Sequence, residues 1–386
     1  MVAFKLAYKN LIGAGLRTWL NVTVLSFAFV LIIFYNGMID GWNRQGRNDT
    51  QEWEVAQGQY WHPNYDKYDV FSIRDSHQAV SGDVKSAVDS GKLVPVLIQQ
   101  ATIYPQGRMF GIMLKGVPHQ QSLLKLPTQG LQPQTSDLPA IIGQRMADAV
   151  KLKKGDKVLI RWRDKNGTFD AREILVADIF HCDVPSVDNG QVYVDYEAIQ
   201  KMMGLNNHAT LLITGDEDPK EIEDWDFKDL KFLLSELDQM IESKKAGGIV
   251  LQVVLLLIAL LAIFDTQVLS IFRRQKEIGT YIALGLTRWQ VVGIFTIEGA
   301  VHSILAALVG AAYGIPFFLW LDTVGLSFGT VDVGITIAEK VYPYYSVGLI
   351  VSTLLLVVLS ATVVSYLPAR KIARMKPTDA LKGKIQ

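Results

Sequence analysis

The chain has 386 residues, of which 49% are hydrophobic, and its 38 Lys and Arg residues balance 38 Asp and Glu residues. The zero net charge gives no argument for nucleic-acid binding, and the gathering of apolar residues into long blocks indicates a membrane protein rather than a set of soluble domains. The single cysteine, Cys182, excludes an intramolecular disulfide. His181 precedes it, but no second pair stands at ligand spacing, so we expect no metal site.

The first 42 residues predict a surface helix followed by a membrane span. Residues 1–17 carry apolar side chains on one helical face and basic ones off it, which is typical of an amphipathic helix on the cytoplasmic surface. Residues 18–42 follow as the first span, because residues 18–39 contain no charge and are numerous enough to cross a bilayer core. A signal peptide is the alternative, but the apolar run is too long and no small-residue cleavage site follows it.

Residues 43–245 have the character of a soluble domain. We expect two hairpins, one across Pro105-Gln106-Gly107 and one across Asp164-Lys165-Asn166-Gly167, where the Asn-Gly pair supplies the positive φ angles of a tight turn. The Pro- and Gln-rich segment 118–139 is expected to be an exposed loop. The pattern predicts an α+β domain with mainly antiparallel strands, with further strands at 191–195 and 209–214 and helices at 77–89, 140–150 and 196–203.

The end of this domain predicts a stalk that leads into the second span. Residues 226–245 place leucines at helical spacing, and Gly247 and Gly248 follow, which we interpret as a hinge. The second span, residues 246–272, contains Asp265 near its cytoplasmic end. A carboxylate in that position needs a partner, and we expect a structural ion pair with Arg273 or the adjoining basic residues rather than a proton relay.

Residues 273–289 lie between two apolar runs and carry four basic residues and one acid. Ile278, Tyr281, Ile282 and Gly285 fall on one face of a predicted helix. A short amphipathic helix between two spans is suited to receive a force from a protein outside the membrane. The alternative is a basic loop that only fixes the topology.

The third span, residues 290–321, contains polar and small residues at helical spacing. Glu298 and His302 lie four residues apart on one face, where we expect a packing role, through a bond to each other or to a partner helix. Ala306, Gly310 and Gly314 recur every fourth residue and predict a face that another helix approaches closely.

The remaining chain sets the predicted orientation. An outer loop, residues 322–340, contains a Gly-x-Ser-x-Gly sequence at 325–329, but no histidine follows it, so it is not a hydrolase elbow. The fourth span, residues 341–367, has no charge, and the tail, residues 368–386, has six basic residues against one in the outer loop. Both termini and residues 273–289 are therefore expected in the cytoplasm, and the soluble domain outside.

Two cytoplasmic motifs resemble a known family. Residues 274–279 read Arg-Gln-Lys-Glu-Ile-Gly and precede Ala283-Leu284-Gly285, while residues 368–373 read Pro-Ala-Arg-Lys-Ile-Ala and precede Lys-Pro-Thr-Asp-Ala-Leu at 376–381. Together with the Glu298-Gly299 pair, these motifs resemble the FtsX/MacB/LolC superfamily of ABC-transporter permeases. Within it, residues 114–118, 140–143 and 155–158 are similar to lipoprotein-releasing (LolC/LolE-like) permeases.

The resemblance implies a non-catalytic subunit of the bacterial inner membrane, with four transmembrane helices and a periplasmic α+β domain between the first and the second. It implies a dimer with an identical permease or a paralogue, joined to a separate ABC ATPase that binds ATP and Mg; no cofactor is implied for this chain. No phosphate loop occurs here, because neither Gly91-Lys92 nor Gly383-Lys384 precedes Ser or Thr. The implied coupling helix contacts the ATPase through Arg274, Glu277, Ile278, Gly279, Tyr281, Ile282, Ala283 and Gly285.

The function implied by the resemblance is transmission of ATPase motion to the periplasmic domain, for lipoprotein release from the inner membrane towards the outer membrane. A periplasmic lipoprotein carrier or adaptor, and membrane lipids, are further implied partners. One alternative is MacB-like export of drugs, peptides or other envelope substrates. An alternative of another class is a membrane receptor, which would need an effector domain that the sequence does not show.

Overall fold

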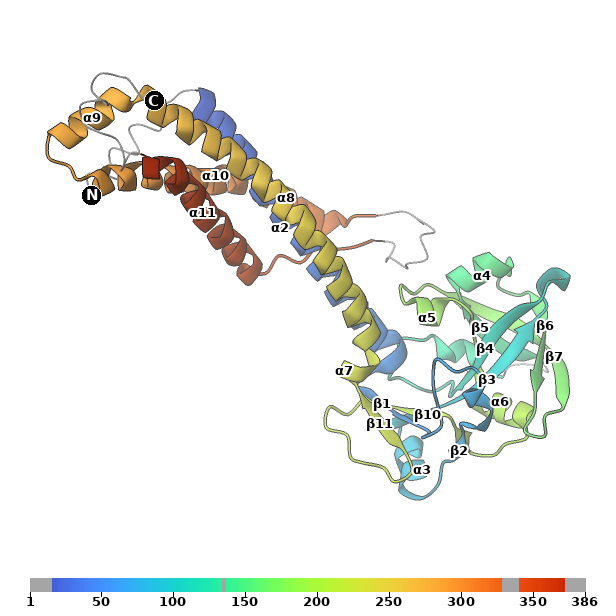
Figure 1. Cartoon of the computed structure of the whole chain (residues 1–386). Helices are drawn as coiled ribbons and strands as arrows, with labels where there is room; N and C mark the ends of the chain where they lie inside the picture. The colour runs from blue at the N-terminus through green and yellow to red at the C-terminus, as the bar shows by residue number, and fades with distance from the viewer. Residues whose placement is uncertain (1–15, 134–136, 328–339, 372–386) are drawn as a thin grey trace. The chain divides into compact units, whose positions relative to one another are not determined.

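The computed structural model describes residues 16–133, 137–327 and 340–371, and these separate into two compact units (Figure 1). The membrane unit comprises residues 16–43, 240–327 and 340–371, and the globular unit comprises residues 44–239 apart from 134–136. Residues 1–15 of the expected surface helix, 328–339 of the outer loop and 372–386 of the tail lie outside the described residues.

Within the described residues four helices are long and apolar enough to cross a membrane, as the sequence predicts: α2 (Leu16–Thr50), α8 (Ser235–Arg273), α10 (Arg288–Val324) and α11 (Val347–Ala369). The last helix begins six residues later than position 341, where the fourth span was expected to start. Its start is set by Ser346, whose Oγ accepts a hydrogen bond from the Leu349 backbone N–H at 3.1 Å and so caps the helix.

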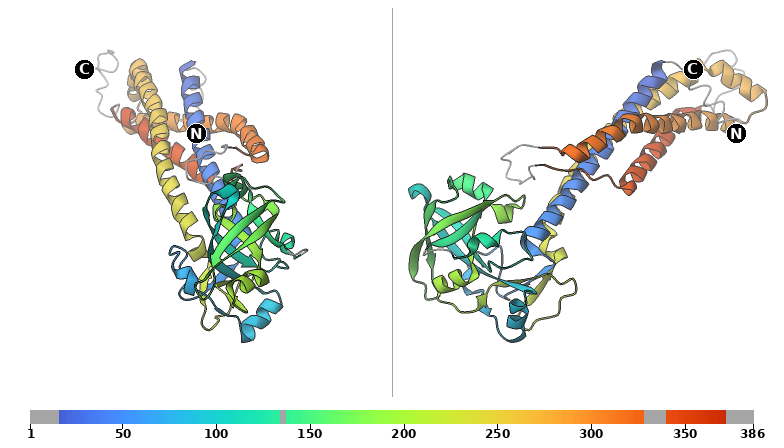
Figure 2. Two further views of the ribbon diagram at one scale, coloured as in Figure 1. Left: turned by 90° about the vertical axis from the view of Figure 1, so that its right-hand side faces the viewer. Right: turned by 180° about the vertical axis from the view of Figure 1, so that it is seen from behind.

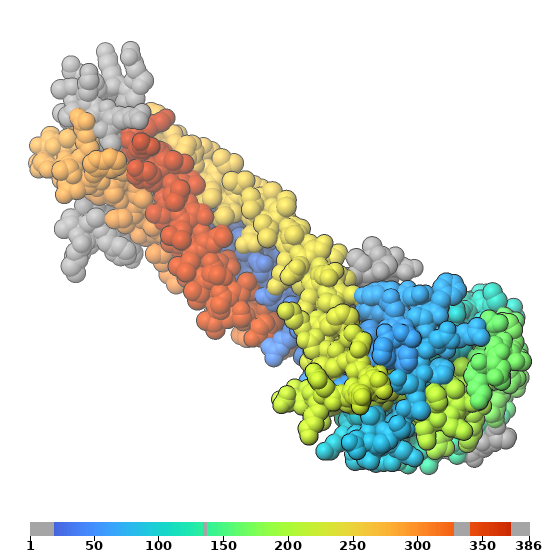
Figure 3. Space-filling view, turned by 60° about the horizontal axis from the view of Figure 1, so that its bottom comes forward, coloured from blue at the N-terminus to red at the C-terminus, as the bar shows by residue number. Residues whose placement is uncertain are grey.

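The four helices share one apolar core, and Figure 3 shows α11 (red) packed along the bundle. Two glycines of α2 allow the segment before α11 to approach closely: a Cβ on Gly37 would lie 2.3 Å from the Tyr345 ring, and one on Gly41 would lie 2.1 Å from the Tyr342 carbonyl oxygen. Core residues come from every helix, including Val22, Leu25, Phe29, Ile33, Ala259, Ile263, Ala306, Val357 and Ala361.

The globular unit is built on a nine-stranded sheet in the order β11-β1-β10-β3-β4-β8-β5-β7-β6. Because β3 also pairs with β6, the strands from β3 round to β6 close into a six-stranded barrel, which Figure 2 shows from two sides. Among the described strands, only β4–β8 and β5–β7 are parallel pairs. The strands are β1 (Gly58–Trp61), β3 (Leu93–Ile103), β4 (Phe110–Val117), β5 (Leu138–Gly143), β6 (Lys157–Arg163), β7 (Phe169–Phe180), β8 (Gln191–Asp195), β10 (Leu211–Thr214) and β11 (Asp226–Asp229).

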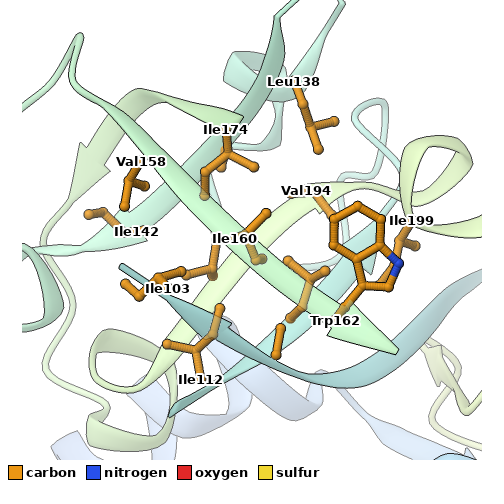
Figure 4. Close-up of a cluster of buried hydrophobic side chains, with 14 of the residues drawn as sticks. Ile103, Ile112, Leu138, Ile142, Val158, Ile160, Trp162, Ile174, Val194 and Ile199 are labelled. Atoms are coloured by element: carbon orange, nitrogen blue, oxygen red, sulfur yellow. The ribbon is translucent and has the colours of Figure 1, made fainter. Parts of the chain in front are cut away.

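Branched side chains fill the barrel. Strand β6 alternates buried and exposed residues, so Val158, Ile160 and Trp162 point inward and meet Ile142, Ile174 and Val194 from other strands (Figure 4). A separate pair of short strands, β2 (Gln78–Ala79) and β9 (His208–Ala209), lies outside the barrel sheet. The helical segments are η1 (Gln51–Val55), η2 (Ser72–Asp75), α3 (Gly82–Asp89), η3 (Pro105–Gly107), η4 (Thr128–Leu131), α4 (Gln144–Val150), α5 (Pro185–Asp188), α6 (Tyr196–Met203) and α7 (Leu230–Leu233).

Both expected hairpins form, but several local predictions were wrong. In the second hairpin only Gly167 has a positive φ, of 80°, so Asn166 is not left-handed. The segment 118–139 is not a wholly exposed loop, because Leu124, Leu126 and Leu131 are buried in a second apolar core. Three of the predicted helices begin later than expected, because a strand occupies the start of each: β2 precedes α3, β5 precedes α4, and β11 precedes α7 and α8. The helix predicted at 196–203 is confirmed as α6.

Candidate functional site

A short helix, α9 (Gln275–Ala283), joins α8 to α10 where the sequence predicts a coupling helix. The junction with α8 is Arg274, which has non-helical angles (φ −99°, ψ 19°). After α9 the chain reverses at Gly285, whose φ of 98° suits glycine. Thr287 and Gln290 then form a capping box at the start of α10, which fixes where the next helix begins.

The apolar face of α9 packs against the chain's own helices. Ile278 is fully buried and contacts a cluster that contains Ile271 of α8, Val291 and Phe295 of α10, and Ala369 of α11. Gly279 is also buried, and Tyr281 and Ile282 pack against the same cluster. In this structure the Ile278 side chain is enclosed by α8, α10 and α11, so it faces the chain's own helices rather than the surface where the implied ATPase contact was expected.

The opposite face of α9 and the turn after it are open. Lys276, Glu277, Thr280 and Ala283 are exposed on the helix, as is Gly285 in the turn. Two large apolar side chains were missed by the sequence reasoning: Leu284 is 75% exposed and Trp289 is 62% exposed. Leu284 directly follows α9, and Trp289 is the second residue of α10, so the signal that could have found them is their position on either side of the predicted turn at Gly285. Together with the exposed residues of α9, they form the surface that this part of the described chain offers to another protein.

Arg274 braces this helix. Its Nε donates to Glu277 Oε2 at 2.8 Å, its Nη1 donates to Glu298 Oε2 at 3.2 Å, and its guanidinium lies 5.0 Å from the Phe295 ring centroid. Arg274 thereby links the start of α9 to the buried carboxylate of α10. Because the Glu298 side chain is only 6% exposed, the ion pair gives that carboxylate the partner it needs.

The predicted pairing of Asp265 with Arg273 is not found. Both side chains are exposed, and among the described residues Asp265 makes no ion pair. The physical reason is that Arg274, one residue further on, turns inward to Glu298, while Asp265 lies on the open side of α8.

The polar and small residues of α10 pack against neighbouring helices. His302 bonds through Nδ1 to the Glu298 backbone oxygen at 2.7 Å rather than to the Glu298 carboxylate. A Cβ on Gly299 would lie 1.8 Å from Ser365 Oγ of α11. Gly310 and Gly314 face α2, where added Cβ atoms would lie 3.3 Å and 3.1 Å from Val30, and Ala306 is buried in the same core.

The expected hinge at Gly247 and Gly248 lies inside α8, which continues from Ser235 to Arg273. A Cβ on Gly248 would lie 2.1 Å from the Tyr35 ring, so this glycine makes room for α2. The Tyr35 hydroxyl donates to the Lys244 backbone oxygen at 3.3 Å, and Lys245 pairs with Asp40 at 2.9 Å. In this structure these residues hold two helices together, and no bend occurs there.

The His181-Cys182 pair does not offer two ligands to one ion. The His181 side chain is 59% exposed, whereas Cys182 is buried. Burial raises the pKa of the Cys182 thiol to about 12, which keeps it protonated and unreactive at neutral pH. No group of three His, Cys, Asp or Glu side chains is arranged for a metal within residues 16–133, 137–327 and 340–371.

Residues 249–377 match the family described as FtsX-like permease, C-terminal. The chain carries an FtsX-like permease domain. This domain contains α9 and α10 completely, together with most of α8 and all of α11. Helix α9, Arg274 and Glu298 thus lie inside the matched region.

Relatives align with parts of the chain. An uncharacterized ABC transporter permease of Methanocaldococcus jannaschii is 28% identical over 128 residues, which is 33% of this chain and 30% of the relative. The macrolide export ATP-binding/permease protein MacB of Wolinella succinogenes is 28% identical, with 42% of this chain and 23% of the relative covered. MacB of Agrobacterium fabrum is 24% identical, covering 56% and 34%. The chain therefore spans about a third or less of each relative.

Two solved structures resemble the chain weakly. The periplasmic region of MacB from Actinobacillus actinomycetemcomitans gives a TM-score of 0.33 at 10% identity, covering 49% of this chain and 96% of that one. The extracellular domain of the noncanonic ABC-type transporter YknZ from Gram-positive bacteria gives a TM-score of 0.23 at 12% identity, covering 40% and 80%. Both scores lie below 0.5 and do not establish a shared fold.

Proposed function

We propose that this chain is the permease subunit of an ABC transporter of the FtsX/MacB type, driven by an ATPase on a separate chain. The observation that carries the proposal is the architecture of α9: it is fixed from inside by Ile278 and Arg274, yet exposes Lys276, Thr280 and Leu284. A helix held in this way moves with α8 and α10 when a partner pushes on its open face. The match of residues 249–377 to the FtsX-like domain supports the same conclusion.

The docking residues of this proposal differ from those that the sequence favoured. Glu277, Ala283 and Gly285 stay on the side offered to the ATPase, and Leu284 and Trp289 join them. Ile278, Gly279, Tyr281 and Ile282 instead connect α9 to the membrane helices. An aspartate at position 282 would thus disturb the packing of the membrane unit, which makes Leu284 the better position for a test.

A second permease completes the proposed complex, either a copy of this chain or a paralogue. The open side of α8 carries a helical stripe of apolar residues in which Asp265 is the one carboxylate. An exposed acid among lipid-facing side chains is unfavourable, and a second helix with a polar partner would cover it. The stripe consists of Val250, Val254, Leu257, Leu261, Asp265, Leu269 and Phe272.

In this proposal the globular unit is the part that moves and acts on the cargo. Helix α8 continues without interruption from Ser235 in the globular unit to Arg273 beside α9. We infer that motion of α9 reaches the globular unit along this helix, and that the unit lies in the periplasm of a bacterium whose inner membrane holds the four spans. The distribution of basic residues supports this orientation.

The proposed cargo is a lipoprotein that leaves the inner membrane for a periplasmic carrier. The similarity of residues 114–118, 140–143 and 155–158 to lipoprotein-releasing permeases supports it. The second candidate is export of a drug or peptide, favoured by the MacB relatives, which are named for macrolide export. A receptor function would be supported instead if the chain were isolated without any ATPase.

Depletion of the chain in its own host separates the two cargo classes. If the cargo is a lipoprotein, outer-membrane lipoproteins accumulate in the inner membrane when the chain is depleted. Any increase in macrolide sensitivity is then an indirect result of the damaged envelope. Complementation with wild-type chain restores both. Normal lipoprotein sorting together with intracellular macrolide accumulation would reject lipoprotein release and support export.

A further inference from the structure

A small pocket opens on the globular unit. Its volume is about 380 Å³, and it lies between η2, the turn that joins β6 to β7, and the end of α6. This volume is near the lower end of the range of about 300–1,000 Å³ for small-molecule sites, so it suits one small ligand or one headgroup. The pocket is lined by Arg74, Asp75, His77, Asp164, Lys165, Asn166, Met203 and Leu205.

The β6–β7 turn forms a rigid wall of this pocket. Asp164 Oδ1 accepts hydrogen bonds from the backbone N–H groups of Asn166 and Thr168 at 2.9 Å and 2.8 Å. The Lys165 backbone N–H donates to the Met203 carbonyl oxygen at 3.2 Å, which ties the turn to α6. The wall is therefore built before any ligand arrives, as preorganised binding sites are.

Two cations and two carboxylates line the pocket without neutralising one another. Within the described residues no ion pair joins Arg74 or Lys165 to Asp75 or Asp164, although all four line the same pocket. A Cβ added to Gly167 would lie 3.2 Å from Arg74 Nη2, so the absence of a side chain there leaves space for the guanidinium. The Lys165 chain packs over Gly204, with Cε 3.4 Å from the corresponding Cβ position.

A histidine pair keeps the lining electrically balanced. His77 Nδ1 lies 3.1 Å from His208 Nδ1, and their rings meet edge to face with centroids 5.1 Å apart. One Nδ1 must donate and the other accept, which requires at least one neutral imidazole. Burial lowers the pKa of both imidazoles below 6.5, so both are neutral at pH 7.5. The two cations and two carboxylates then give the lining no net charge, although charged groups of both signs line it.

We propose that this pocket binds a small dipolar ligand, whose anionic group is held by Arg74 and Lys165 and whose ammonium group is held by Asp75. Asp164 contributes its remaining carboxylate oxygen, and Met203 and Leu205 contact the carbon atoms between the two charged groups. Two sources carry this chemistry, the zwitterion of a short peptide and a phosphoethanolamine headgroup. The inference does not depend on the proposed transport function.

Calorimetric titration of the full chain in a non-ionic detergent at pH 7.5 tests the pocket, with glycylglycine and O-phosphoethanolamine as separate probes. We expect at least one probe to bind, and Arg74→Ala and Asp75→Asn each to weaken that binding about tenfold or more, since a hydrogen bond to a charged group contributes about 1.5–3 kcal/mol. Lys85→Ala, at an exposed lysine of α3, is the matched control and leaves affinity unchanged.

The outcomes distinguish a peptide ligand from a lipid headgroup, and they also decide whether the pocket binds a dipolar ligand at all. Binding of glycylglycine alone assigns a peptide ligand, and binding of O-phosphoethanolamine alone assigns a lipid headgroup. N-acetylglycine, which lacks the ammonium group, must bind more weakly than glycylglycine in the peptide case. If neither probe binds, or if Arg74→Ala and Lys165→Met keep wild-type affinity while retaining the wild-type melting temperature, the proposal is overturned. Should Arg74→Ala not fold, Asp75→Asn and Lys165→Met decide.

Discussion

At the scale of single residues, Arg274 has the contacts that most directly join α9 to the membrane helix α10. Its side chain is 15% exposed and lies between the exposed Glu277 and the buried Glu298. The neighbouring Arg273 is exposed on the surface of α8. The two adjacent arginines therefore differ in role: Arg274 connects two helices, whereas Arg273 faces outward. The direction of their side chains, which the sequence does not give, makes this difference.

Replacing Arg274 with alanine should destabilise the membrane unit by about 3 kcal/mol, because it leaves the Glu298 carboxylate buried without a counter-charge. Thermal unfolding in detergent measures the effect, with Arg273→Ala as a control that we expect to be near neutral. The double variant Arg274→Met/Glu298→Gln should recover much of the loss. Equal melting temperatures for the two single variants would contradict this assignment.

The histidine pair in the globular unit predicts a loss of stability in mild acid. Burial lowers the pKa of His77 and the pKa of His208 below the 6.5 of an exposed imidazole. The charges of His208 and His62 lower the pKa of His77 further, while Asp75 raises it. The charge of Lys165 lowers the pKa of His208 further. Below about pH 6.5 the unfolded chain thus binds more protons than the folded one, and stability falls as pH falls.

Melting curves of the full chain at pH 7.5 and pH 5.5 check this sign. The double variant His77→Asn/His208→Asn should show a smaller decrease in melting temperature over this interval than the wild type. His181→Asn, at an exposed histidine, should retain the wild-type decrease. A double variant with an undiminished pH dependence would show that other groups are responsible.

At the scale of helices, the contact between α10 and α11 depends on a glycine. Gly299→Ala would place a Cβ 1.8 Å from Ser365 Oγ, so the helices must separate, and we expect a clear fall in melting temperature. Gly293, on the same helix, has open space around its Cβ position, so Gly293→Ala should be neutral or slightly stabilising. Adding Ser365→Gly to Gly299→Ala should restore stability; a failure to do so would place the strain elsewhere.

The elements differ in how far the sequence predicts them. The four spans follow from uninterrupted apolar runs, and the two hairpins follow from alternation around Gly107 and Gly167, so both could be predicted. The strand at 138–143 could not, because a fully buried apolar run has no alternation and resembles a helix segment. The closure of β3 onto β6 is a long-range pairing with no local signal.

The candidate site was predictable in position but not in orientation. The spacing of Ile278, Tyr281 and Ile282 identifies an apolar face on α9, as the structure has it. Sequence alone does not tell whether that face meets another protein or the chain's own helices, since both are apolar. Ile278 is enclosed, so the surface left for a partner is the exposed side of α9, with Leu284 after it and Trp289 at the start of α10.

At the scale of the whole molecule, the proposal requires an ATPase, a second permease and a route for motion between them. The open face of α9 offers the first contact, and the stripe of α8 around Asp265 offers the second. The dipolar pocket belongs to the globular unit and adds a ligand that either cargo model can accommodate.

The measurement that tests the central claim most directly is affinity purification of the tagged chain from its host in mild detergent, with the proteins that co-purify identified and counted. We expect an ABC ATPase and a second permease with the wild type, loss of the ATPase with Leu284→Asp, and its retention with Leu159→Asp, at an exposed leucine of β6. Retention of the ATPase by Leu284→Asp would refute α9 as its docking site, and absence of any ATPase from the wild-type preparation would contradict the transporter function itself.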